Sequence, residues 1–264
     1  MSDAGRLFSD GEAYERSMGR WSRIAGEIFL DWLDAPKGLR WLDVGCGNGA
    51  FTEVLIARCA PAAVTGVDPS DGQLNFARTR PGARIARFER GDAQALSFAD
   101  RSFDAASMAL AINFVPEPQK AADEMARVVK GGGLVATYMW DTLNGGSPLS
   151  PVQAAIKSLG MPVAAGHSGT ASQRENLRGF WHRAGLQAIE MRQLRIKVVY
   201  SDFDDLWNSV SARGSTTGEA IAGMSPATRE QLRLRLCEQV PAAAADGSIS
   251  YEAFANAVKG RAPN

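Results

Sequence analysis

Short apolar stretches alternate with helical patterns through residues 21–140, and this alternation limits the folds that the chain can adopt. The stretches have the length of buried strands, and the residues between them place apolar side chains at helical spacing. Such alternation is typical of a parallel sheet covered on both faces, because each helix returns the chain to the same end of the sheet. The predicted strands are residues 40–44, 63–68, 85–88, 103–110 and 134–140, and the predicted helices are residues 21–33, 51–58, 71–79 and 118–130.

The pattern changes after Asp141. Residues 144–172 are rich in Gly, Ser, Ala and Pro and indicate a loop with short helical pieces, whereas residues 248–259 can form a last strand. We predict an α/β fold, a Rossmann-like doubly wound sheet that is mostly parallel with an antiparallel last strand, plus a helical cap from residues 144–172 and 201–247. The expected division is residues 1–143, with an N-terminal helix and the Rossmann-like core, and residues 144–264, with the cap helices and the final strands that complete the sheet.

Local signals predict where several helices begin and end. Ser201 is expected to cap a helix, with Asp204 completing a capping box. Ser225 and Pro226 predict the start of a further helix, because proline is favourable at the first helical position. Gly131 stands where the helix of residues 118–130 would need a left-handed C-cap.

The composition excludes several classes of protein. The 264 residues carry 29 basic and 29 acidic side chains, so the chain lacks the basic excess expected of a nucleic-acid-binding protein. Three cysteines without a C-x-x-C spacing and only two histidines exclude a disulfide framework, structural zinc and a histidine-rich metal site. No apolar run is long enough to span a membrane, and the first residues lead into no signal-peptide core, so we expect a cytoplasmic protein without metal.

Glycines and acids gather at the predicted strand ends. The sequence Asp43-x-Gly45-x-Gly47-x-Gly49 joins a strand to a helix, and glycines there let a ligand approach the backbone closely. Asp68 ends the next strand, 19 residues beyond Gly49, where an acid can accept hydrogen bonds from ribose hydroxyls. A further pair, Asp92 and Ala93, follows the third strand in position to meet an adenine amino group. The carboxyl ends of these strands line one crevice, so a nucleoside ligand is indicated.

The spacing of the glycines favours one nucleoside cofactor over another. A dinucleotide site usually shows G-x-G-x-x-G, whereas this chain has G-x-G-x-G with Ala50 after the third glycine. The negative charge of Asp43 would disfavour a bound pyrophosphate but is compatible with a cationic ligand. A positively charged adenosine cofactor is therefore favoured over NAD.

Four motifs together resemble class I S-adenosylmethionine-dependent methyltransferases. They are similar to this family in order and spacing over residues 38–141, and most similar to the subgroup with the ubiquinone and menaquinone C-methyltransferases. Gly131 stands where the family usually has proline. The motifs are WLDVGCGNG at residues 41–49, GVDPSDGQL at residues 66–74, GDA with LSF and SFD at residues 91–104, and ARVVKGGG at residues 126–133.

The resemblance implies S-adenosyl-L-methionine as cofactor, S-adenosyl-L-homocysteine as product, and a set of contacts. It implies Asp68 on the ribose, Asp92 and Ala93 on the adenine, and Ala109 near the methionine end. In related enzymes the N-terminal segment folds over the cofactor, which makes Tyr14 and Arg20 candidates for the methionine carboxylate. The expected cofactor-binding residues are Tyr14, Arg20, Asp43, Gly45, Cys46, Gly47, Gly49, Asp68, Pro69, Gln73, Asp92, Ala93 and Ala109.

The acceptor side is less determined by the sequence. Asn113 follows the fourth strand and can orient an acceptor but cannot act as a base; Tyr138 and Trp140 end the fifth strand. His167 and His182 are expected to be ordinary surface or helix residues. The apolar cap residues Met161, Phe180, Trp181, Phe203 and Trp207 could enclose an apolar or aromatic acceptor, or form the core of the cap itself.

These observations predict a methyltransferase that acts on a small molecule by direct in-line transfer, with unknown oligomeric state and no nucleic-acid partner. A base is needed only if the acceptor must lose a proton. Two alternatives stay open: a non-catalytic S-adenosylmethionine-binding partner protein, which would show the same motifs, and an NAD-type oxidoreductase, which would need a different glycine spacing.

Overall fold

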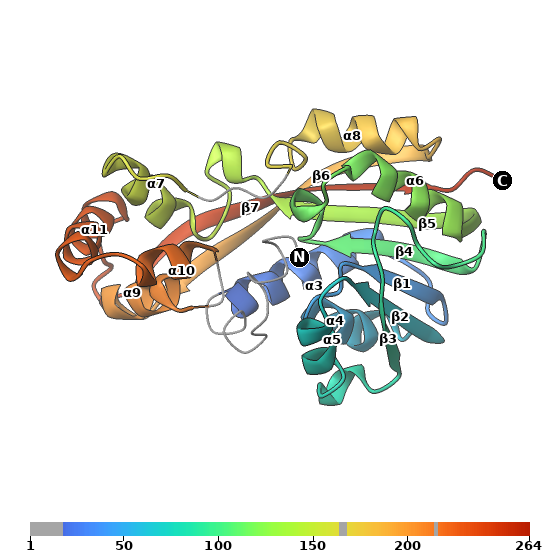
Figure 1. The fold of residues 1–264 in the computed structure, drawn as a ribbon, viewed down its shortest axis with the longest axis horizontal. Helices are drawn as coiled ribbons and strands as arrows, with labels where there is room; N and C mark the ends of the chain where they lie inside the picture. Colours follow the sequence, from blue (N-terminus) through green and yellow to red (C-terminus); the bar gives the residue numbers. More distant parts are fainter. Residues whose placement is uncertain (1–17, 164–167, 214–215) are drawn as a thin grey trace.

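The computed structural model describes residues 18–163, 168–213 and 216–264, which form a single seven-stranded sheet with helices on both faces (Figure 1). The strand order is β3-β2-β1-β4-β5-β7-β6, and only β7 runs antiparallel to its neighbours. The predicted α/β fold with an antiparallel last strand is therefore confirmed. The strands are β1 (Arg40–Val44), β2 (Ala63–Asp68), β3 (Ala86–Arg90), β4 (Phe103–Ala109), β5 (Val129–Trp140), β6 (Gln187–Tyr200) and β7 (Ile249–Arg261).

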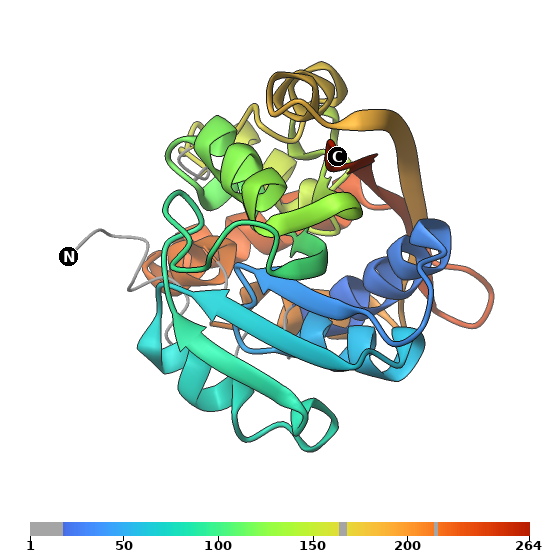
Figure 2. The same ribbon diagram turned by 90° about the vertical axis from the view of Figure 1, so that its right-hand side faces the viewer.

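Helices cover both faces of the sheet (Figure 2). The central strand β1 is buried on both sides: Trp41 packs with the helices on one face, and its neighbour Leu42 packs with those on the other. This double burial explains why the strands read as continuous apolar runs. The helices on one face are α3 (Arg20–Leu33) and α4 (Ala50–Cys59), those on the other are α6 (Pro118–Val128) and α8 (Arg174–Arg183), and α5 (Asp71–Ala77) packs beside β2 and β3.

The last two strands form a ribbon that extends past the rest of the sheet. Trp140 ends β5 opposite Ala255, whereas β6 and β7 stay paired for six more residue pairs, as far as Tyr200 and Ile249. At about 3.3 Å per residue the ribbon projects roughly 20 Å beyond the carboxyl end of β5. The cap helices gather on this projection (Figure 1): α7 (Ser150–Ser158), α9 (Phe203–Ser211), α10 (Thr216–Ala222) and α11 (Pro226–Gln239).

In the part of the chain that the structure describes, short 3-10 helices complete the connections: η2 (Pro81–Ala83), η3 (Ile112–Phe114) and η4 (Thr142–Asn144). Within the described residues, no helix combines the length and the apolarity needed to cross a bilayer.

Two predicted helix caps are wrong. The α6 helix ends at Val128, and Val129 is already extended and paired with Phe103, so Gly131 caps nothing and the left-handed residue is Gly132. The cap of α9 is Asp202 rather than Ser201; its side chain accepts from the backbone of Asp205. The shift by one residue arises because both positions hold residues that can cap a helix.

The prediction that Trp181 belongs to the cap is also wrong. Its ring is fully buried against the sheet, and its Nε1 donates to the carbonyl oxygen of Val135 at 3.0 Å. The neighbouring Phe180 packs with the same cluster. The α8 helix therefore covers one face of the sheet and does not line a lid.

Candidate functional site

The glycine loop between β1 and α4 holds three left-handed residues. Gly45, Gly47 and Gly49 have φ angles of 69°, 50° and 77°. A Cβ atom on Gly45 would lie 2.7 Å from the Cβ of Ala111, whereas one on Gly47 would meet no atom within 4 Å. The loop therefore packs tightly against the end of β4 at one glycine and leaves its backbone open to a ligand at the next.

Backbone and side-chain hydrogen bonds join this loop to the end of β2. The amide of Gly47 donates to Asp68 Oδ2 at 2.9 Å, and the amide of Ser70 donates to Oδ1 at 2.9 Å. The amides of Gly45 and Cys46 both donate to the carbonyl of Val67. Burial raises the pKa of Asp68, although the two amide hydrogen bonds oppose the shift. The predicted ribose-binding acid is thus fixed in place by the glycine loop itself.

Asp43 lies beneath the loop and is fully buried. Thr52 Oγ1 donates to Asp43 Oδ2 at 2.6 Å, and Oδ1 has no hydrogen-bond partner among the described residues. Burial raises the pKa of Asp43 to about 7; the bond from Thr52 lowers it, and the nearby charge of Asp68 raises it. A buried carboxylate without a cationic partner is costly, so the site suits a positively charged ligand.

The third acid, Asp92, is exposed at the start of the loop after β3. The backbone amide of Gln94 donates to Asp92 Oδ1 at 2.9 Å, and the Gln94 side-chain amide donates to both carboxylate oxygens at 3.0 and 3.1 Å. Gly91, just before Asp92, donates its amide to the carbonyl of Asp68 at 3.2 Å. The acids of the second and third strands are therefore linked through the backbone.

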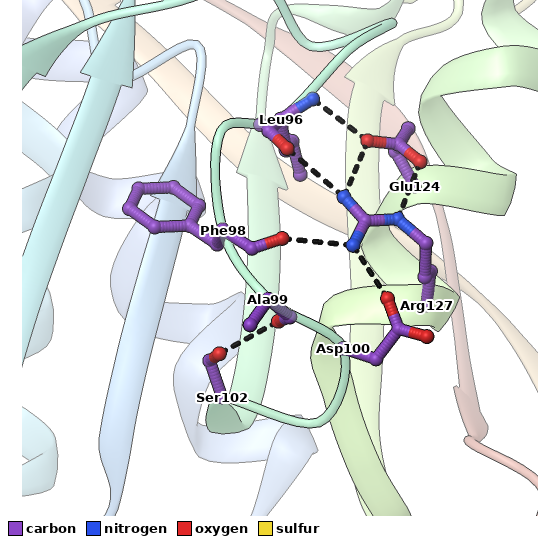
Figure 3. A network of polar contacts seen from close by, with 7 residues as sticks. All are labelled: Leu96, Phe98, Ala99, Asp100, Ser102, Glu124 and Arg127. Carbon is purple, nitrogen blue, oxygen red and sulfur yellow. Dashed lines mark hydrogen bonds and ion pairs between the residues drawn. The ribbon is translucent and has the colours of Figure 1, made fainter.

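A cluster around Arg127 holds the rest of this loop on α6 (Figure 3). The guanidinium donates to the carbonyls of Leu96 and Phe98 and to the carboxylates of Asp100 and Glu124. Glu124 also accepts from the amide of Leu96 at 2.7 Å, and its hydrogen bond with Arg127 lowers the pKa of its carboxyl. Because one side chain bonds four groups, the segment that carries Asp92 is anchored at its far end.

The end of β4 contains a strained residue and a buried amide. Leu110 has a φ of 56°, a conformation unusual for a non-glycine residue, directly after the half-buried Ala109. Asn113 is 3% exposed, and its Oδ1 has no partner among the described residues. The backbone carbonyl of Asn113 accepts from Ser168, whose hydroxyl donates to the carbonyl of Val115. The loop that carries Asn113 is therefore fixed by Ser168, a residue distant in the sequence.

The other predicted acceptor-side residues are buried. The ring of Tyr138 packs against Phe29 and Phe51, with centroids 4.6 and 6.1 Å away. Trp140 is 4% exposed and belongs to the same cluster as the cap helices. The structure thus brings Asn113 to a strand end but places both aromatic side chains within the core.

A buried polar cluster beyond β5 was missed by the sequence analysis. Asp141 Oδ2 accepts from Asn256 Nδ2 at 3.0 Å, and both of its oxygens accept from Asn144. The same amide of Asn256 donates to the carbonyl of Ser172, while Asn256 Oδ1 has no described partner. Only the position of Asp141 at a strand end could have signalled this cluster, since its partners are distant in sequence.

The remaining predicted residues lie in varied positions. Arg20 is exposed, donates to the carbonyl of Val199 at 2.9 Å and stacks on Trp21, so it contacts the ribbon. Cys46 is buried, which raises the pKa of its thiol. Gln73 is buried at the start of α5, Pro69 is exposed and Ala93 is half-buried; His182 is exposed on α8, and Tyr14 and His167 lie outside the described residues.

Two hollows on the surface lie away from these residues. One of about 390 Å³ is bordered by the ribbon, at Arg195, Lys197 and Tyr251, and one of about 270 Å³ lies between α6 and α8. Neither is lined by the glycine loop or the three acids, so the candidate site rests on the geometry of the strand ends. Within the described residues, no group of three or more metal-binding side chains occurs.

Comparison with known proteins supports one family. Residues 42–137 match the family model described as a methyltransferase domain. The matched segment and the fold are similar to those of class I, S-adenosylmethionine-dependent methyltransferase domains. Over these residues the chain is similar to the methyltransferase domain family, whose members use S-adenosylmethionine.

Individual relatives cover the chain to different extents. A fatty-acid O-methyltransferase of Mycolicibacterium smegmatis is 37% identical over 37% of this chain and 35% of its own length. A malonyl-[acyl-carrier protein] O-methyltransferase of Erwinia pyrifoliae is 29% identical over 90% of this chain and 85% of its own length. A solved structure described as a possible histamine N-methyltransferase, from Thermotoga maritima, has a TM-score of 0.57 at 21% identity, covering 97% of this chain and 98% of its own. The chain spans less than half the length of several curated relatives that it matches, among them the fatty-acid O-methyltransferase.

Proposed function

We propose that this chain binds S-adenosylmethionine over the carboxyl ends of β1, β2 and β3 and transfers its methyl group to a small-molecule acceptor. The observation that carries the proposal is the bond between the Gly47 amide and Asp68 Oδ2. It joins the glycine loop, where the backbone is open, to an acid that can accept from ribose hydroxyls.

The residues present fit each part of this cofactor. Asp68 would accept from the ribose, and Asp92 with Ala93 would contact the adenine. The backbone of Gly45, Gly47 and Gly49 would contact the cofactor, with Cys46 in the same loop. Pro69 and Gln73 would lie beside the adenosine, and Ala109 would lie near the methionine end. The buried carboxylate of Asp43 matches a ligand that carries a sulfonium and an ammonium charge, because a cation compensates the cost of its ionisation.

The proposed reaction is an in-line displacement that needs alignment more than acid–base chemistry. When bound, the cofactor supplies a methyl group on a positively charged sulfur. The chain contributes orientation: the tight contact between Gly45 and Ala111 fixes the loop against β4. The Oδ1 atom of Asn113 would accept a hydrogen bond from an acceptor group but cannot remove its proton.

The acceptor is proposed to be a small apolar or aromatic molecule. The cap joins its apolar side chains to the core cluster that contains Trp140, and one named relative is a fatty-acid O-methyltransferase. A second named relative is a malonyl-[acyl-carrier protein] O-methyltransferase. The balanced charge of the chain also favours a small molecule over a nucleic acid.

Calorimetric titration with S-adenosylhomocysteine and, in parallel, NADH tests this proposal. We expect micromolar binding of the former alone. Asp68→Ala should weaken that binding by about 2 kcal/mol or more, because two hydroxyls lose a charged acceptor. Asp71→Ala, which removes an exposed acid from the same segment, is the matched control. Binding of NADH alone, or unchanged affinity in Asp68→Ala, would contradict the proposal.

A turnover assay separates an enzyme from a binding partner. Release of S-adenosylhomocysteine in the presence of apolar and carboxylic acceptors supports transfer. Tight cofactor binding without release for any acceptor class would instead favour a non-catalytic cofactor-binding protein.

A further inference from the structure

We propose that Gln94 is a positioning residue that holds the carboxylate of Asp92 for adenine, and so determines how well the chain distinguishes adenine from other bases. The inference rests on the proposed function, since it assigns a role beside the same cofactor. Gln94 belongs to none of the motifs that indicate the cofactor.

The contacts of Gln94 fix the orientation of its side-chain amide. Its Oε1 accepts from the backbone amide of Glu117 at 3.0 Å, and its Nε2 donates to both oxygens of Asp92. A backbone N–H can only donate, so the carbonyl end of the amide must face Glu117 and the NH₂ end must face Asp92. The flipped amide would set two donors against each other and an oxygen against a carboxylate.

This arrangement restricts an acid that would otherwise rotate freely. Asp92 is exposed, and an exposed side chain on a loop samples several rotamers. Three hydrogen bonds from Gln94, one from its backbone and two from its side chain, hold the carboxylate in one plane. The remaining lone pairs of the two oxygens are then presented in a fixed direction.

The chemistry of the donor also matters. Gln94 is neutral, so it orients Asp92 without neutralising its charge, as an arginine or lysine would. An ionised carboxylate accepts a stronger hydrogen bond from an amino group than a neutral acceptor does. The adenine amino group is a donor, whereas the corresponding oxygen of hypoxanthine is an acceptor that a fixed carboxylate repels.

The link to Glu117 extends the support to the start of α6. Glu117 caps this helix, and Arg127 near its other end anchors the segment from Leu96 to Asp100. The loop after β3 is therefore attached to α6 near both ends of the helix, and of these contacts only the one from Gln94 touches Asp92. Loss of that contact should alter base recognition rather than the fold.

Two variants separate positioning from simple support of the loop. Gln94→Glu keeps an oxygen that accepts from Glu117 but cannot donate to Asp92, whereas Gln94→Met removes both contacts at similar length. Gln231→Met is the control for the same change on the exposed side of α11, and Ser102→Ala loosens the same loop without touching Asp92.

The experiment is calorimetric titration of each protein with S-adenosylhomocysteine and with its inosine analogue, beside melting temperatures. We expect the natural chain to prefer the adenine compound by about tenfold or more, and Gln94→Glu to reduce this preference to about threefold or less while it melts with the natural chain. Gln94→Met should lose the preference as well, and both controls should keep it.

Each outcome has one meaning. If the natural chain binds both compounds and the Gln94 variants keep its preference, the role of Gln94 is overturned and the proposed function stands. If Ser102→Ala loses the preference as strongly as Gln94→Glu, loop support explains the effect and the role of Gln94 is again overturned. If the natural chain binds neither compound, both the proposed function and this inference fail.

Discussion

The two halves of the sheet's carboxyl edge are built differently. Over β1, β2 and β3, the backbone amides that hold Asp68 lie 2 and 21 residues away in the sequence, at Ser70 and Gly47. Over β4 and β5 the polar groups are held by distant segments: Ser168 bonds Asn113, and Asn256 bonds Asp141. The proposed cofactor site, which we call the cofactor half, therefore depends on short motifs. The proposed acceptor site, which we call the acceptor half, depends on segments that are far apart in the sequence.

The largest expected effect in the cofactor half is a change of the unfolding free energy with pH, caused by the buried carboxyl of Asp43. Its folded-state pKa of about 7 exceeds its unfolded value of 3.8, so between these values the folded protein holds a proton that the unfolded chain has lost. Stability therefore falls as pH rises, and the loss is complete above pH 7. Relative to Asp43→Asn, the natural chain should lose about 3 kcal/mol of unfolding free energy between pH 5 and pH 8.

Urea unfolding at pH 5, 6.5 and 8 measures this difference. Asp31→Asn, which makes the same change at an exposed position, is the control. If the difference in unfolding free energy between Asp43→Asn and the natural chain stays constant across this range, the pKa of Asp43 is not raised in the folded protein and the prediction is wrong.

Gly45→Ala tests whether the cofactor half is sterically fixed. The added Cβ would lie 2.7 Å from that of Ala111, at a φ of 69°. We expect a loss of about 2–3 kcal/mol in unfolding free energy, from backbone strain and overpacking together. Gly38→Ala shares the positive φ but has open space around it, so it should lose only about 1 kcal/mol. Equal losses would mean that the contact with Ala111 relaxes without cost.

Asn256→Ala tests the acceptor half. It removes both donors to Asp141 and Ser172 and leaves the buried carboxylate with Asn144 alone. The expected loss of unfolding free energy is about 1–2 kcal/mol, with affinity for S-adenosylhomocysteine unchanged within about twofold. Asn176→Ala, which removes a less buried bond to the carbonyl of Thr170, should cost less. A large loss of affinity for S-adenosylhomocysteine would show that the acceptor half and the cofactor half are energetically coupled, which contradicts the contrast drawn here.

Asn113→Ala should have the smallest effect on cofactor binding. Its amide oxygen has no described partner, so its loss removes no contact of the cofactor half. We expect affinity for S-adenosylhomocysteine to stay within about twofold while turnover falls. Calorimetry beside the release assay measures both quantities; a tenfold loss of affinity would refute the placement of Asn113 on the acceptor side.

The same contrast explains how much the sequence predicted. The strand and helix alternation and the glycine loop are local patterns, and the sheet they predict is the one observed. The cap of α9 was misplaced by one residue because Ser201 and Asp202 are both good caps, and the backbone alone decides between them. The bond between Asn256 and Asp141 joins residues 115 apart, and no periodicity reports such a contact.

The ribbon of β6 and β7 has a consequence for how proteins of this shape diverge. Tyr200 and Ile249 are paired neighbours, so the chain leaves the sheet and returns to it at adjacent points, with α9, α10 and α11 in between. A segment with such close ends can be lengthened, shortened or exchanged as a cassette without moving any strand. Under the function proposed above, exchange of residues 201–248 for the equivalent stretch of a relative would change the acceptor and leave the proposed cofactor site unchanged.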